Sequence, residues 1–62
     1  MKRVKVKSKR GTLMEIISYD PISKLFYCFI PHLDMTLSIH PSGIDIDEKK
    51  LDTLKEEMAN ES

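Results

Sequence analysis

The sequence predicts an α+β fold, a four-stranded antiparallel sheet (a meander or a small barrel) followed by one C-terminal helix. Three observations lead to this fold class. Two segments alternate apolar with polar residues, the period of a half-buried strand. A continuous apolar run, residues 25–30, has the length of a central strand. Near the C-terminus, Leu51, Leu54 and Met58 are spaced as on one helix face.

The first predicted strand is an edge strand. Val4 and Val6 alternate with Lys5 and Lys7, and outward lysines discourage pairing with another chain. Gly11 then supplies a turn. The second strand is expected over 12–19, and its pattern suggests two partly apolar faces. We expect one face to hold Leu13, Ile17 and Tyr19 and the other to hold Met14 and Ile16.

Turn residues separate the remaining elements. Asp20 and Pro21 predict a tight turn before the apolar run, and Pro31 ends that run. On the run, Leu25, Tyr27 and Phe29 should face opposite to Phe26, Cys28 and Ile30. The fourth strand is expected over 35–40. Asp47 is the predicted N-cap of the helix, with Ile46 and Leu51 as a hydrophobic staple.

The chain of 62 residues leaves room for a single domain, 1–62, with 58–62 as a frayed tail. No stretch approaches the roughly 20 apolar residues of a membrane span, and no apolar signal segment follows the basic N-terminus. We therefore expect a cytoplasmic protein without membrane contact. Its single cysteine, Cys28, fits a reducing compartment.

The zero net charge conceals a strong asymmetry. The first ten residues carry six positive charges and no acid, from Lys2, Arg3, Lys5, Lys7, Lys9 and Arg10. Acidic residues outnumber basic ones after residue 44. The basic residues could neutralise phosphates, which makes a nucleic-acid interface one interpretation. Equally, the lysines of the first strand could protect a sheet edge or pair with the helix acids.

The sequence offers little for catalysis. His32, His40 and Cys28 could form a metal or thiol site, but a cysteine inside an apolar strand is usually an inert core residue. No glycine-rich phosphate loop is present. We therefore expect no enzyme activity, no catalytic or metal-binding residues and no cofactor.

The apolar side chains of the middle strands outnumber what one short helix can cover. Leaving several of them in water would forgo a few kcal/mol, at about 25 cal/mol per Å². We therefore expect a protein partner, most simply a second copy forming a homodimer, on the uncovered face, with Phe26, Tyr27 and Ile30 as anchors. A small closed barrel that buries both sets internally is the alternative. The leading functional interpretation is a non-enzymatic protein-interaction or regulatory module, with nucleic-acid binding by the basic strand as the second.

The chain also resembles the KTSC domain, a short bacterial and phage module. The similarity runs through Val6-Lys7-Ser8, Tyr19-Asp20-Pro21, Lys24-Leu25 and Ser42-Gly43-Ile44, with Ile17, Phe29, Leu51, Leu54 and the C-terminal Ala59-Asn60-Glu61-Ser62. A weaker similarity to HicB-type antitoxins rests on the hairpin, the acidic helix and the corner Ile30-Pro31-His32-Leu33. Either resemblance implies a small non-enzymatic module of phage or bacterial origin, and neither supplies catalytic residues.

Overall fold

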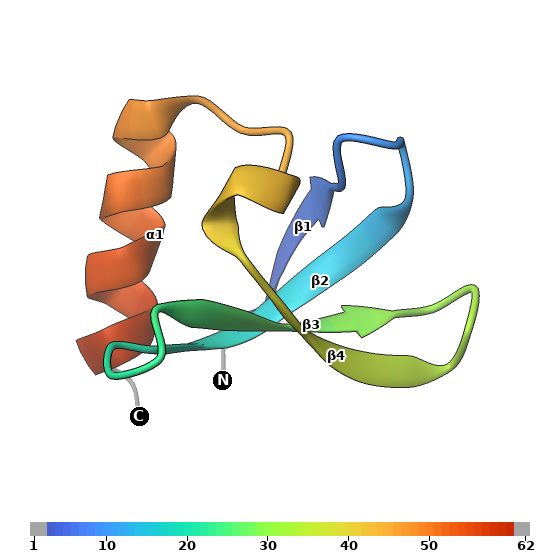
Figure 1. The fold of residues 1–62 in the computed structure, drawn as a ribbon, viewed down its shortest axis with the longest axis horizontal. Helices are drawn as coiled ribbons and strands as arrows, with labels where there is room; N and C mark the ends of the chain where they lie inside the picture. The colour runs from blue at the N-terminus through green and yellow to red at the C-terminus, as the bar shows by residue number, and fades with distance from the viewer. Residues whose placement is uncertain (1–2, 61–62) are drawn as a thin grey trace.

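A computed structural model describes residues 3–60, which form a four-stranded antiparallel meander and one long helix (Figure 1). The strands are β1 (Val4–Lys7), β2 (Leu13–Asp20), β3 (Leu25–Ile30) and β4 (Met35–Ile39), and they neighbour one another in chain order. A short 3₁₀ helix, η1 (Pro41–Gly43), precedes α1 (Glu48–Asn60). The predicted fold class is therefore confirmed.

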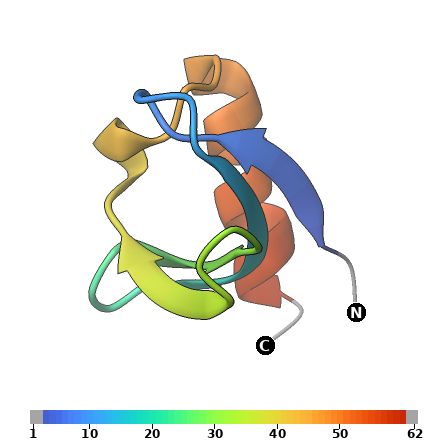
Figure 2. The ribbon, with the colours of Figure 1, turned by 90° about the vertical axis from the view of Figure 1, so that its right-hand side faces the viewer.

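The sheet curls strongly but does not close into a barrel (Figure 2). Its two edge strands, β1 and β4, do not pair. Instead, the segment after η1 runs back to the end of β1, where Ser8 forms an isolated bridge with Ile44. The amide of Asp45 donates to the carbonyl of Lys7 over 2.8 Å, and the amide of Lys9 donates to the carbonyl of Gly43 over 3.0 Å. These bonds hold the curl without completing a ring of strands.

A bulge in β2 determines which side chains reach the core. The register of β2 with β3 shifts between Ile16 and Ser18, so Ile17 is an extra residue. The shift places Tyr19 on the same face as Met14 and Ile16, and all three are buried. The expectation that Tyr19 shares the opposite face with Leu13 is therefore wrong, because simple alternation fails at a bulge. Tyr19 instead packs on Phe26, with ring centroids 4.7 Å apart.

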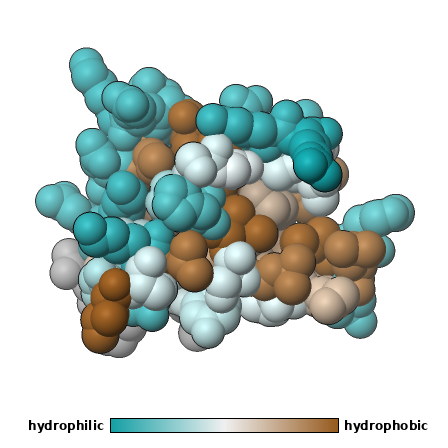
Figure 3. All heavy atoms as spheres, in the orientation of Figure 1, coloured by the Kyte–Doolittle hydropathy of each residue, from teal (hydrophilic) through white to brown (hydrophobic). Residues whose placement is uncertain are grey.

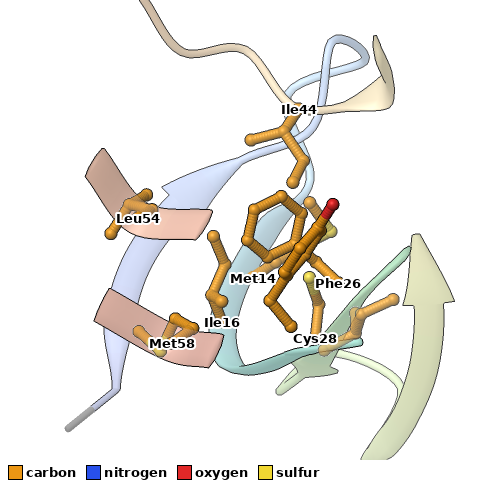
Figure 4. Close-up of a cluster of buried hydrophobic side chains, with 9 residues drawn as sticks. Met14, Ile16, Phe26, Cys28, Ile44, Leu54 and Met58 are labelled. Atoms are coloured by element: carbon orange, nitrogen blue, oxygen red, sulfur yellow. The ribbon is translucent and has the colours of Figure 1, made fainter. Parts of the chain in front are cut away.

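The core lies inside the curl and is completed by α1 (Figure 4). Leu54 and Met58 are buried against the strands, and Leu51 packs at the margin of the core, as their helical spacing predicts. The carbonyl of Asp47 accepts the Leu51 amide at 2.8 Å, which agrees with the predicted N-cap position. The tail predicted at 58–62 begins too early, because Met58 is helical and only 2% exposed.

The turn between β2 and β3 is built by Asp20, as predicted. Its carboxylate accepts the Ile22 amide and the Ser23 hydroxyl, both at 3.0 Å. Its carbonyl accepts the amide of Lys24 at 2.7 Å, and Lys24 takes the left-handed conformation with φ 63°. This local geometry aligns β3 against β2 and thereby sets the two faces of the sheet.

Candidate binding face of the sheet

The two faces of the sheet differ sharply in burial. Opposed residues in an antiparallel sheet point to the same side, so the register separates an inner face from an outer face. On β3, Phe26, Cys28 and Ile30 point inward and are buried, whereas Tyr27 points outward and is 47% exposed. Leu25 and Phe29, which lie on the same side as Tyr27, are half-buried. The predicted alternation of β3 is confirmed.

Two of the three predicted partner anchors are therefore wrong. Phe26 is fully buried and Ile30 is only 5% exposed, because the curled sheet and α1 enclose the inner face within one copy of the chain. Neither side chain can contact a partner in this structure. Tyr27 remains accessible on the outer face. The apolar side chains of the middle strands are therefore divided between an inner face that is buried and an outer face that a partner can reach.

The outer face comprises the outward side chains of the four strands. One row crosses the sheet through Lys5, Glu15, Phe29 and Thr36, and the next row consists of Ser18, Tyr27 and Ser38. Lys7 and Leu13 form a further pair at one end. A strip of aromatic side chains on β3, Phe29 and Tyr27, thus lies between polar residues of β2 and hydroxyl side chains of β4, with the lysines of β1 at the border.

Arg3 links the basic strand to this strip. Its guanidinium lies 3.3 Å from a carboxylate oxygen of Glu15 and 5.6 Å from the ring centroid of Phe29. The ion pair is partly exposed, so its own contribution to stability is small, at most about 1 kcal/mol. The contact nevertheless brings a cation, an anion and an aromatic ring together on one surface, an arrangement that residues 3, 15 and 29 do not reveal in the sequence.

The other described basic residues among the first ten have no acidic partner within residues 3–60. Lys5, Lys7, Lys9 and Arg10 are all exposed, and no ion pair joins them to an acid within residues 3–60. The alternative in which the lysines pair with acids of α1 is therefore wrong for these residues. Lys2, the sixth predicted phosphate-binding residue, lies outside the described range.

Apolar side chains also gather at the end of the sheet where the β3–β4 turn lies. Leu13, Leu33 and Met35 are 62%, 53% and 51% exposed. Figure 3 shows a continuous hydrophobic area over β4 and this turn. A shallow hollow of about 180 Å³ lies beside Leu13 and Pro31 and is also lined by Lys5, Met14 and Glu15. Apolar side chains that are exposed side by side are a candidate surface for interaction with another molecule.

Cys28 is a core residue, His40 caps a helix and His32 lies in a turn. Burial raises the pKa of the Cys28 thiol to about 11, which keeps it protonated and unreactive near neutral pH. His40 accepts the Ser42 amide through Nδ1 at 3.1 Å and thereby caps η1, while His32 is exposed in the β3–β4 turn. Within residues 3–60, no group of three His, Cys, Asp or Glu side chains could hold a metal ion.

Neither helix in residues 3–60 has the length and apolar character needed to cross a membrane.

No protein-family model matches the chain, and neither a curated protein nor a solved structure matches it. The KTSC-like and HicB-like resemblances therefore stay predictions.

Proposed function

We propose that this chain is a small non-enzymatic protein-interaction module that acts in the cytoplasm and binds its partner through the outer face of the sheet. The observation that carries the proposal is the division between the two faces. The inner face is sealed by the curl and by α1, whereas the outer face keeps Tyr27 accessible on β3 and Leu13 accessible opposite Lys7 of β1.

The chemistry of the outer face indicates the kind of protein that it fits. Tyrosine is enriched among the residues that dominate binding energies, because its ring contributes contact area and its hydroxyl a hydrogen bond. Tyr27 lies at the middle of the face, with Ser18 and Ser38 opposite it on the neighbouring strands. The lysines at the β1 border favour a partner with acidic residues around an apolar centre.

Single-stranded nucleic acid is a second candidate ligand, favoured by one observation. Lys5 and Phe29 lie in the same cross-strand row, so a cationic strand and an aromatic ring share one surface. Surfaces that bind single strands combine these two features. Against this candidate, the carboxylate of Glu15 stands between them and would repel phosphate. The protein partner is therefore the leading proposal.

A capture experiment with matched variants tests the leading proposal. The tagged wild-type chain, the double variant Leu13→Ser/Tyr27→Ser and the control Ile22→Ser are each immobilised separately and compared in the proteins that they capture. The control removes an equally apolar but remote side chain that is 91% exposed. We expect one set of proteins to be retained by the wild type and the control and lost by the double variant. Retention that is unchanged in the double variant would contradict the proposal.

The nucleic-acid candidate is tested separately by titrating labelled oligo-dT and oligo-U at low and moderate salt. Binding that weakens steeply with salt and that is lost in Lys5→Gln/Lys7→Gln would support it, since phosphate contacts release counterions. No binding at low salt would refute it, and would leave the protein-interaction proposal unaffected.

A further inference from the structure

The outer edge of β4 differs from the outer edge of β1. Beyond its pairing with β3, β4 has no backbone hydrogen bond among the described residues, and it lies at the free border of the sheet in Figure 1. The end of β1, by contrast, is bonded to residues 43–45 through Ser8, Lys7 and Lys9. The end of β1 is therefore covered, whereas β4 is open along its length.

Sequence reinforces this difference between the two edges. Natural proteins protect exposed edge strands with lysines, prolines or bulges. β1 carries two lysines in four residues, whereas the five residues of β4, Met-Thr-Leu-Ser-Ile, include neither a charge nor a proline. Its register with β3 is also continuous, without a bulge. The β4 edge thus lacks each of these protective features.

The residues of β4 are also self-complementary. When two antiparallel copies of β4 are aligned about a two-fold axis at Leu37, Met35 lies opposite the partner's Ile39, and Thr36 lies opposite the partner's Ser38. Apolar side chains then meet apolar ones on the inner side, and hydroxyls meet hydroxyls on the outer side. A shift of the register by two residues keeps the faces but leaves only three opposed residues per strand.

The residues that flank β4 do not continue the ladder. Asp34 belongs to the β3–β4 turn, with φ 51°, and His40 caps η1. The pairing therefore rests on the five residues of β4 itself. Met35, half-exposed in one copy, would gain apolar contacts at the junction.

From these observations we infer that the chain forms a two-fold symmetric homodimer by antiparallel pairing of β4 with β4 of a second copy, which joins the two sheets into one of eight strands. The dimer uses the edge of the sheet and leaves the outer faces free, so it does not depend on the proposed function. In the joined sheet the two outer faces are continuous, and the two basic β1 strands lie at its opposite ends.

Charge-pair variants test this pairing. Thr36→Lys/Ser38→Lys places lysine opposite lysine twice across the two-fold axis, and Thr36→Glu/Ser38→Glu does the same with glutamate. Both positions are exposed, so the monomer fold should be kept, which circular dichroism verifies. The control Thr12→Lys/Ile22→Lys adds the same charge at exposed positions away from β4.

Sedimentation is measured from about 1 μM to about 1 mM, because an interface confined to one strand edge belongs to the weak class. We expect the wild type and the control to shift with concentration from the 7.2 kDa monomer to the dimer. Each charged variant alone should stay monomeric, and an equimolar mixture of the two should associate again as a heterodimer.

Two outcomes would overturn the inference. One is a wild type that remains monomeric over the whole concentration range. The other is a dimer that persists in both charged variants, which would place the interface elsewhere. If the capture experiment still depends on Leu13 and Tyr27 in either case, the β4 pairing fails while the proposed function stands.

Discussion

Replacing Phe26 with alanine tests whether this residue belongs to the core or to a binding surface. Phe26 is the largest of the fully buried side chains, and its ring packs against the ring of Tyr19. Truncating a buried phenylalanine costs about 3–5 kcal/mol, from lost transfer free energy and the cavity that remains. A domain of 62 residues has a total unfolding free energy of roughly 3–9 kcal/mol. Phe26→Ala should therefore be marginally stable or unfolded.

The adjacent residue provides the control. Tyr27 is about half-exposed on the other face, so Tyr27→Ala should cost at most about 1 kcal/mol. Urea unfolding followed by circular dichroism gives both values. If Phe26→Ala does not fold, Phe26→Leu keeps part of the side-chain volume and should lose about 1–2 kcal/mol. Equal losses for Phe26→Ala and Tyr27→Ala would refute the assignment of the two faces.

Three further outcomes follow from local geometry. The pKa of Asp20 should lie below 3.8, because the Ile22 amide donates to its carboxylate. The resulting stabilisation is present above pH 3.8 and is lost as the pH falls through the lowered pKa. An NMR titration that gives a pKa of 3.8 or more would contradict this. Gly11 and Lys24 both have positive φ, a conformation that is strained for residues other than glycine. Gly11→Ala should therefore lower the melting temperature by the equivalent of about 1 kcal/mol, and Lys24→Gly should raise it. Shifts of the same sign in the two variants would contradict this reasoning. Burial raises the pKa of the Cys28 thiol to about 11, so as the pH rises the unfolded chain loses the thiol proton before the folded chain does. The free energy of unfolding should therefore fall between about pH 9 and about pH 11. Cys28→Ala, measured in parallel, should lack this pH-dependent fall.

Much of the fold could be predicted because its signals are local. The alternation in β1 and β4, the Asp20 turn and the helical stripe each depend on residues close together in the chain, and each appears in the structure. The faces of β3 also followed from simple alternation, since its register is regular.

The errors arose where distant segments meet. The bulge at Ile17 inverts the face of Tyr19, and no local pattern marks it. The anchors Phe26 and Ile30 were misplaced because the curl of the sheet, held by the bridge from Ser8 to Ile44, buries the inner face without a partner. Curl depends on long-range contacts that period-two patterns do not encode.

The candidate site was only partly visible for the same reason. The basic residues near the N-terminus are evident in the sequence, but of the outward aromatics only Tyr27 is predicted as an anchor, and it is grouped there with the buried Phe26 and Ile30. The row from Lys5 through Glu15 to Phe29 exists only after three strands are set in register. The open edge of β4 likewise becomes apparent only when the strand order is known.

Thiol reactivity at two neighbouring positions is the most direct measurement of the central claim, that one copy seals its inner face and leaves its outer face available. Cys28 points inward, and Tyr27→Cys in a Cys28→Ala background places the only thiol on the outer face. At about pH 8 with a disulfide reagent, the outer thiol should react more than about 100-fold faster than native Cys28, which becomes accessible only when the domain opens. Equal rates at the two positions would contradict the claim.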